Sequence, residues 1–291
     1  MLTRFFIFLL WVLHWLPLPV LAVLGNGLGV LLYTLGRERR RVARTNLRLC
    51  FPDMGEAARE KLVRGHFRAF GRSFLERGLA WWASEKRLRR LIRLNGVEHI
   101  QALSGRPVIL MVPHFVALDM GWIRLTLDFA MAGMYANQKN PEFNEALHKG
   151  RVRFNQPVAV SRQQGLRASM KAIKSGRPFF YLPDMDYGPK EALFVPFFNV
   201  PAATITGLSR LAGLTGATVL PCVVRALDGG GGYEVEIGRP WGDFPSGDLP
   251  ADTRRMNAYI EDWVKKMPEQ YYWLHKRFKT RPPGEPSFYD R

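Results

Sequence analysis

A histidine and an aspartate five positions apart offer the clearest chemistry in this sequence, in the stretch Val112-Pro-His-Phe-Val-Ala-Leu-Asp119. An imidazole titrates near neutral pH, so His114 can take a proton from a hydroxyl, and a nearby carboxylate can fix its tautomer. On one ideal helix, positions five apart point about 140° away from each other. The pair therefore requires His114 in the turn after a strand and Asp119 in the first turn of the next helix. On spacing alone, an aspartate that merely caps the helix fits equally well.

The surrounding residues predict that strand-to-helix turn. Apolar residues precede His114, Pro113 breaks the strand, and an amphipathic run follows from Leu118. Downstream of about Leu94 we expect strands at 107–112, 178–182, 217–224 and 233–237, and helices at 97–103, 118–130, 141–155, 163–175, 203–214 and 251–267. This alternation predicts an α/β fold with a mixed, largely parallel central sheet flanked by helices. Sites in such sheets lie at the carboxyl ends of strands, where His114 and Asp184 both fall.

A second acidic pair, Asp184 and Asp186, lies in one loop after a predicted strand. A metal pair is conceivable, but no histidine or further acid is close in the sequence, so we predict neither a metal nor another cofactor. The neighbouring Pro183-Asp184 and Tyr187-Gly188-Pro189 are good turn formers. We therefore expect a structural role with some contact to the site, and we keep both acids as candidates for binding substrate or stabilising charge. Four other histidines lack an acidic partner at a meaningful spacing and are interpreted as structural or interfacial: His66, His99, His148 and His275.

The first 36 residues are a predicted membrane anchor. No charged residue occurs from Phe5 to Gly36. This length can cross the roughly 30 Å hydrocarbon core, or it can form two short helices hinged at Pro17 and Pro19 within one leaflet. A cleavable signal peptide is the rival interpretation, but the apolar run is too long for one. The arginines that begin at Arg37 predict, by the positive-inside rule, a body on the cytoplasmic side of the membrane.

Charge is concentrated in the segment that follows the anchor. The 291-residue chain has a net charge of +17, and residues 37–93 carry 17 Lys and Arg against 6 Asp and Glu, a net +11. Such a block indicates a polyanionic partner, namely nucleic acid, anionic headgroups of membrane phospholipids or an acidic carrier protein. No nucleic-acid-binding motif is visible, so nucleic acid is not expected. We predict three parts: the anchor 1–36, a basic amphipathic helical region 37–93 at the membrane surface, and an α/β core 94–291.

Several motifs along nearly the whole chain resemble the lysophospholipid acyltransferase superfamily, and more closely the late acyltransferases of lipid A biosynthesis. They are Asn46-Leu-Arg-Leu-Cys-Phe-Pro52, the His114 and Asp119 pair, Gly150-Arg-Val-Arg-Phe154, Tyr181-Leu-Pro-Asp-Met-Asp-Tyr-Gly188, Phe194-Val-Pro-Phe-Phe198, Ala203-Thr-Ile-Thr-Gly-Leu-Ser-Arg-Leu-Ala212 and the block from Pro268 to Pro282. The chain departs from close relatives in two places. Asp119 stands where they often carry Glu, and Ala136 follows Tyr135 where they often carry Arg.

The resemblance implies an acyl transfer reaction at the cytoplasmic side of a bacterial inner membrane. The donor would be an acyl thioester of acyl carrier protein, and the acceptor a hydroxyl of an acyl chain on a lipid A precursor. His114 would be the general base and Asp119 would orient it, with no covalent acyl-enzyme. We assign Arg151 to a carboxylate, a donor phosphate or the developing oxyanion, although a surface arginine fits as well. Phe194, Phe197 and Phe198 are candidates for an acyl-chain tunnel, although an ordinary core strand is the commoner use of such residues.

Two other functions compete with this interpretation. A glycerophospholipid acyltransferase acting on lysophosphatidate would carry an acidic-Gly-Thr-Arg type of block after the second strand. In this chain that place is occupied by Pro183-Asp-Met-Asp-Tyr-Gly188. A non-enzymatic membrane scaffold that recruits polyanions through residues 37–93 would leave the pairing of His114 with an acid as coincidence.

Overall fold

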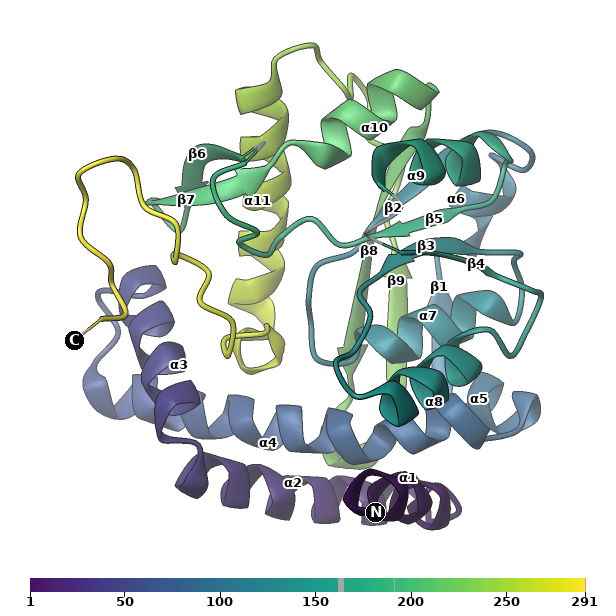
Figure 1. Ribbon diagram of the computed structural model, residues 1–291, viewed down its shortest axis with the longest axis vertical. Coiled ribbons are helices and arrows are strands. Elements are labelled where there is room, and N and C mark those ends of the chain that lie inside the picture. The colour runs from purple at the N-terminus through teal and green to yellow at the C-terminus, as the bar shows by residue number, and fades with distance from the viewer. Residues whose placement is uncertain (162–164, 191, 291) are drawn as a thin grey trace.

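A mixed sheet lies at the centre of the computed structural model, which describes residues 1–161, 165–190 and 192–290 (Figure 1). Within these residues seven strands pair in the order β1-β9-β8-β2-β5-β3-β4, and every neighbouring pair is parallel except β8 with β9. The strands are β1 Ile92–Asn95, β2 Val108–Met111, β3 Ala132–Tyr135, β4 Val158–Ser161, β5 Phe179–Tyr181, β8 Thr218–Ala226 and β9 Tyr233–Ile237. The predicted largely parallel sheet is therefore confirmed.

Helices cover both faces of this sheet because its strands are apolar on both sides. In β2, Ile109 and Met111 belong to one buried core, and Val108 and Leu110 to the other. The first core lies under α9 Gly165–Lys174, α10 Gly207–Thr215 and α11 Leu249–Lys266. The second lies under α6 Val97–Gln101, α7 Leu118–Thr126, α8 Pro141–Arg151 and the C-terminal part of α4 Glu56–Trp82. A separate antiparallel pair, β6 Ala192–Phe197 and β7 Val200–Ile205, packs on α11.

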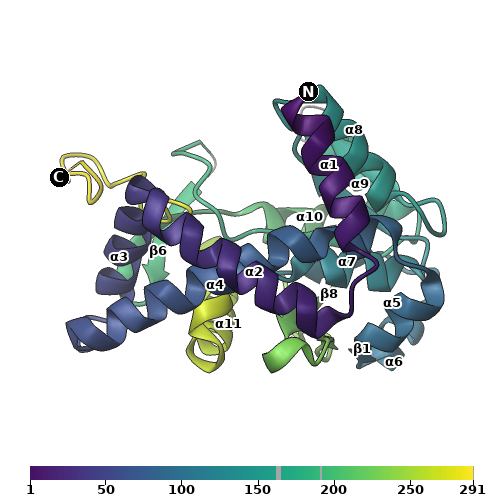
Figure 2. The ribbon, with the colours of Figure 1, turned by 90° about the horizontal axis from the view of Figure 1, so that it is seen from below.

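The N-terminal segment forms two helices, and the chain bends between them at Pro17. These are α1 Leu2–Leu13 and α2 Leu18–Leu35, and α3 Arg37–Cys50 follows. Figure 2 shows α2 lying along α4, with α1 turned away at an angle. Glycines allow the backbones of α2 and α4 to touch: a Cβ on Gly29 would lie 2.4 Å from the carbonyl oxygen of Phe67, and one on Gly71 would lie 2.4 Å from that of Gly25. Helix α2 therefore packs directly against α4, backbone to backbone, and any side chain at these glycines would clash.

The outer sides of α1 and α2 remain apolar and exposed. Helix α2 is long and apolar enough to cross a membrane, although 28% of it is buried within the protein. The exposed large side chains on the two helices and the turn between them include Phe5, Phe8, Trp11, Trp15, Val23, Leu31 and Leu35. Apolar patches of this extent on a protein surface mark an interaction site.

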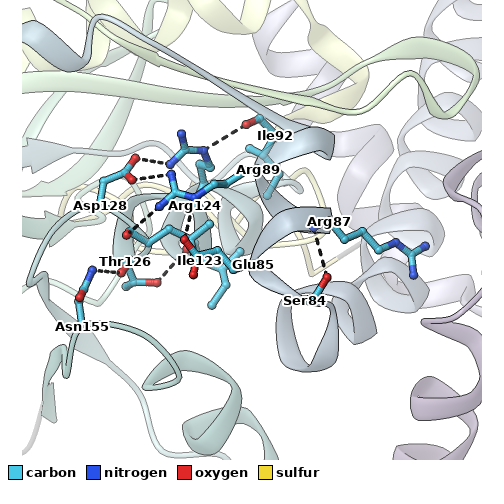
Figure 3. Close-up of polar contacts among 11 residues, drawn as sticks. Ser84, Glu85, Arg87, Arg89, Ile92, Ile123, Arg124, Thr126, Asp128 and Asn155 are labelled. Carbon is cyan, nitrogen blue, oxygen red and sulfur yellow. Dashed lines mark hydrogen bonds and ion pairs between the residues drawn. The ribbon is translucent and has the colours of Figure 1, made fainter.

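A polar network fixes helix α7 at its C-terminal end (Figure 3). Arg89, on α5 Glu85–Leu91, reaches Asp128 at 2.6 Å, and Arg124 donates to the carbonyl oxygen of Ile92 at 3.2 Å and pairs with the same Asp128. Asn155 donates to the carbonyl oxygen of Thr126 at 2.9 Å. These contacts tie α7 to α5 and β1, and so hold in place the helix whose first turn carries Asp119.

Several predicted elements differ from the observed ones. The expected helix 203–214 begins only at Gly207, because residues 203–205 form the end of β7. Strands β1, β3, β4, β6 and β7 are not predicted. Strands β3 and β4 have four residues each, and β1 lies in a segment whose basic residues favour a helix. Strands β6 and β7 contain Pro196 and Pro201, which argue against a strand in a sequence pattern. The first two residues of the expected helix 163–175 lie outside the described residues, and its remainder agrees with α9.

Candidate active site

His114 follows β2 in an extended turn, and its imidazole is held by the carboxylate of Asp184. The distance from His114 Nδ1 to Asp184 Oδ1 is 2.7 Å, and the main-chain N–H of His114 donates to Asp184 Oδ2 at 3.0 Å. Asp184 follows β5, the parallel neighbour of β2, so the two residues leave the same edge of the sheet. The Asp184 side chain is fully buried. A carboxylate on Nδ1 directs the Nε2 lone pair away from it, so Nε2 is the atom that can accept a proton.

The prediction that Asp119 orients His114 is therefore wrong: the carboxylate that contacts the imidazole belongs to Asp184. Asp119 lies in the first turn of α7, as predicted, but its oxygens accept from two arginines. Arg151 Nη2 lies 2.9 Å from Oδ1, and Arg77 Nε lies 3.3 Å from Oδ2. The reason lies in the strand order, since β5 is adjacent to β2 and brings Asp184 against the ring. The first turn of α7 instead faces α4 and the end of α8.

Electrostatics favour ionised carboxylates at both positions. Burial opposes ionisation of Asp184, but the charge of His114 and its hydrogen bonds, with Arg277 further away, outweigh burial and lower the pKa of Asp184. Burial likewise opposes ionisation of Asp119, but Arg151 and Arg77 outweigh it and lower the pKa of that group. The site therefore holds two stable negative charges, one against the imidazole and one between two guanidiniums.

The C-terminal segment encloses His114 from the other side. The N–H of Tyr272 donates to the carbonyl oxygen of His114 at 3.0 Å, and that of Val116 donates to the carbonyl oxygen of Gln270 at 2.9 Å. Burial, followed by the charge of Asp184, raises the pKa of Tyr271 well above its ordinary value, so this phenol stays protonated beside the carboxylate. The block from Pro268 onward thus fixes the turn that carries the histidine.

A cavity of about 400 Å³ opens over these groups. Its polar lining includes His114, Asp119, Arg77 and Arg151, and its apolar and aromatic lining includes Phe70, Leu118, Met134 and Leu182. The imidazole retains 15% of its surface and Arg151 26%, so both can meet a ligand. This volume and this mixture of apolar walls with a few converging polar groups are typical of a small-molecule site.

Hydrogen bonds tie Asp186 to the C-terminal segment and to its own loop. Its carboxylate accepts from the N–H and the hydroxyl of Thr280 at 2.7 and 2.8 Å, and from the N–H of Gly188 at 2.9 Å. Its own N–H donates to Nε2 of His275 at 3.0 Å. Asp186 therefore links the C-terminal segment to the loop that carries Asp184. Asp184, in contrast, contacts the imidazole of His114.

The predicted acyl-chain tunnel at Phe194, Phe197 and Phe198 is not where the cavity lies. Phe197 is fully buried and packs against Tyr271 and Phe278. Phe194 is 39% exposed on the two-stranded sheet, and Phe198 packs on Phe51. The alternation of β6 explains this, since successive side chains point to opposite faces and cannot together line one tunnel. None of the three lines the cavity over His114.

Sequence reasoning missed Arg77 and undervalued Asp184. Arg77 comes from α4, 42 positions before its partner Asp119, and nothing in a block of 17 basic residues distinguishes it. Asp184 did carry a signal, because it follows a strand as His114 does, and adjacent parallel strands end at the same edge. Arg151 was assigned to a carboxylate, a phosphate or an oxyanion, and in the structure it contacts the carboxylate of Asp119.

A histidine held by a buried carboxylate at the edge of an α/β sheet, beside an arginine pair and an apolar cavity, suits proton transfer on an amphipathic substrate. Residues 1–280 match the family model of the bacterial lipid A biosynthesis acyltransferases. The chain is 37% identical over 283 residues to a lipid A biosynthesis lauroyltransferase of Escherichia coli, an alignment that covers 96% of this chain and 92% of the relative.

Two further relatives agree in type. A lipid A biosynthesis palmitoleoyltransferase of Escherichia coli is 34% identical, with 99% of this chain and 94% of the relative covered. A lipid A biosynthesis myristoyltransferase of the same organism is 32% identical, with 94% and 84% covered. The chain belongs to the bacterial lipid A biosynthesis acyltransferase family. The cavity over His114 is accordingly the candidate site of acyl transfer.

Proposed function

We propose that this protein transfers a fatty acyl chain from the thioester of acyl carrier protein to a hydroxyl of an acyl chain on a lipid A precursor, with His114 as the general base. The observation that carries the proposal is the contact between His114 Nδ1 and the buried carboxylate of Asp184, within a cavity of a chain from this family. It supports a base that is held in one tautomer and one orientation, as general-base catalysis requires.

The reaction balances without a covalent enzyme intermediate. Nε2 of His114 takes the proton of the acceptor hydroxyl as its oxygen attacks the thioester carbonyl carbon. The carbon–sulfur bond then breaks, and the imidazolium returns the proton to the departing thiolate. Asp184 stabilises the imidazolium between the two steps. Cys50 and Cys222 are poorly suited to an acyl-cysteine route, because both are buried in the core and burial raises the pKa of each thiol.

The arginine pair supports a role in binding negative charge. Asp119 accepts from Arg77 and Arg151, and the two guanidiniums together leave one positive charge in excess of this carboxylate. Both arginines line the cavity that holds His114. We assign them to the developing oxyanion or to a phosphate of the substrate, with Asp119 as the residue that positions them.

Membrane seating follows from the exposed apolar side chains of α1 and α2. With α2 docked on α4, we infer that both helices enter one leaflet and keep the cavity near the lipid surface, with the body in the cytoplasm. The basic residues of 37–93 would attract an acidic carrier protein and the phosphates of membrane lipids and lipid A precursors.

One reaction series tests the proposal. The purified full-length protein in detergent is incubated with acyl carrier protein thioester and either a lipid A precursor or lysophosphatidate, and the lipids are analysed by mass spectrometry. Acylation of the lipid A precursor that disappears in His114→Ala is the expected result. Acylation of lysophosphatidate instead would establish a glycerophospholipid acyltransferase, and no acyl transfer by the folded protein to either acceptor would leave the membrane-scaffold alternative.

A further inference from the structure

Two small residues leave a trough in the sheet beside the candidate active site. Gly133 on β3 is in register with Phe180 on β5 and with Ala159 on β4, so the three residues form a row across three parallel strands. Residues in register on parallel strands point to the same face of a sheet. Gly133 has no side chain and Ala159 only a methyl group, so this row is hollow between its aromatic member and the edge of the sheet.

The indole of Trp122 closes this trough from above. A Cβ on Gly133 would lie 2.7 Å from Cζ3 of Trp122, so only glycine allows the ring to cross the strand at this height. Trp122 is 7% exposed, stacks edge-on against Phe180, and donates from Nε1 to the carbonyl oxygen of Arg151 at 2.9 Å. The ring is thereby held in one position rather than free to move aside.

What remains open is a recess of about 40 Å³. Trp122, Gly133, Ala159 and Phe180 line its inner part. Six residues line both this recess and the cavity over His114: Leu118, Asp119, Met134, Tyr135, Arg151 and Leu182. The recess is therefore the apolar inner end of the cavity, with its charged residues at the entrance.

We propose that this recess receives the end of the donor acyl chain, and that Trp122 and Ala159 set the chain length the enzyme accepts. The inference rests on the proposed acyl transfer and adds its specificity residues. A chain whose thioester carbon lies at His114 extends past Leu118 and Leu182 into the trough, and its terminal methyl group meets the indole. Longer chains require the ring to move, and shorter chains leave apolar surface unfilled.

The test is a competition between acyl carrier protein thioesters with even-numbered saturated chains of about eight to about eighteen carbons, scored as relative kcat/KM. Trp122→Leu deepens the trough and should raise the preference for a chain two carbons longer than the wild-type optimum by about tenfold or more. Ala159→Leu fills the trough and should shift the optimum to shorter chains by a similar factor. Ala159 is partly exposed, which gives the added side chain room to be accommodated on folding.

Two control variants separate volume from other effects. Trp122→Phe also loses the hydrogen bond to Arg151 but removes less volume than Trp122→Leu, so its optimum should move towards longer chains by less. Trp263→Leu, on α11, removes an indole outside the recess and should leave the whole profile unchanged. An unmoved optimum in both Trp122→Leu and Ala159→Leu, with transfer retained, would overturn the recess while leaving the proposed function intact. A change confined to the choice of acceptor would also overturn it. Failure of the wild type with every thioester would refute the function itself.

Discussion

His114 and Asp184 lie 70 positions apart in the chain, and in the structure Nδ1 of the histidine is 2.7 Å from Oδ1 of the aspartate. The aspartate also accepts the main-chain N–H of the same histidine. One buried carboxylate thus fixes both the ring and the backbone of the candidate base. Asp119, the acid of the short motif, is instead the anchor of two arginines. The site therefore contains a base unit, His114 with Asp184, and a cation unit, Asp119 with its two arginines. Mutagenesis can separate the two units.

The base unit should behave as one group in kinetics. His114→Ala should lower kcat by roughly 10²–10⁴ with the protein still folded, because the proton acceptor is lost. Asp184→Asn should also lower kcat strongly, because an amide can hold the wrong tautomer and cannot stabilise the imidazolium. The double variant should be little worse than His114→Ala alone. Effects that multiply, in variants shown by circular dichroism to be folded, would contradict the pairing.

The cation unit should give a different pattern. Asp119→Asn should lower kcat/KM about 10-fold to 100-fold, because it removes charge-assisted hydrogen bonds that position Arg77 and Arg151. Asp119→Glu keeps the carboxylate and should retain much of the activity. In the His114→Ala background, Asp119→Asn should still weaken binding of the anionic substrate, measured by isothermal titration. If Asp119→Asn left substrate binding unchanged both in the wild type and in the His114→Ala variant, the two arginines would have no role in substrate recognition.

Two buried histidines should make the fold sensitive to mild acid. Burial lowers the pKa of His66 to about 4, and burial, followed by the charge of Arg277, lowers that of His275 to about 4. Between pH 6.5 and 4 the unfolded chain binds protons that the folded protein does not, so the free energy of unfolding falls as the pH falls through this window and is full above it. For His66 the effect is about 3 kcal/mol at most.

Chemical denaturation across this pH range measures that effect. His66→Gln can still donate to the carbonyl oxygen of Glu269, which lies 2.9 Å from Nδ1 of the histidine. This variant should lose stability at neutral pH yet show a shallower pH dependence than the wild type. An unchanged slope would mean that His66 does not contribute to acid sensitivity.

The glycines between α2 and α4 should be essential to the docking of the N-terminal helices. Gly29→Leu should displace α2, because even a Cβ there would overlap the backbone of α4. We expect a lower midpoint of thermal unfolding and faster tryptic cleavage within the arginines that begin α3. Gly27→Leu is the matched control, since a Cβ at Gly27 meets nothing within 4 Å. Equal behaviour of the two variants would show that α2 is not held by this contact.

Salt should separate carrier-protein binding from chemistry. If the basic residues of 37–93 attract an acidic carrier protein, higher ionic strength should raise KM for its thioester more than KM for the same acyl group on a small neutral thiol. Both donors are assayed with the same acceptor in the same detergent, so any effect of salt on the acceptor or the detergent is common to both measurements. Equal sensitivity for both donors would assign the basic block to lipid or to no ligand.

Local pattern was sufficient for the α/β class and for the strand-to-helix turn at His114, because both depend on residues close together in the chain. It left open whether the N-terminal segment breaks at Pro17 and Pro19. It was insufficient for β3 and β4, whose four residues each carry too few alternations to be recognised. It also placed Phe194, Phe197 and Phe198 in one tunnel, although Phe197 belongs to a core built by α11 and the C-terminal segment.

The sequence by itself determined the family, and it supplied the candidate base and the set of acids from which the partner of that base had to come. Which acid holds the imidazole depended on strand order, since hydrogen bonding of β2 with β5 brings Asp184 to His114 while helix α7 turns Asp119 towards Arg77 and Arg151. The recess under Trp122 likewise depended on register, because only the pairing of three strands places Gly133 between Ala159 and Phe180. The amino-acid sequence shows which side chains are available. Which of them meet across distant segments is decided only when the chain folds and buries its apolar surfaces.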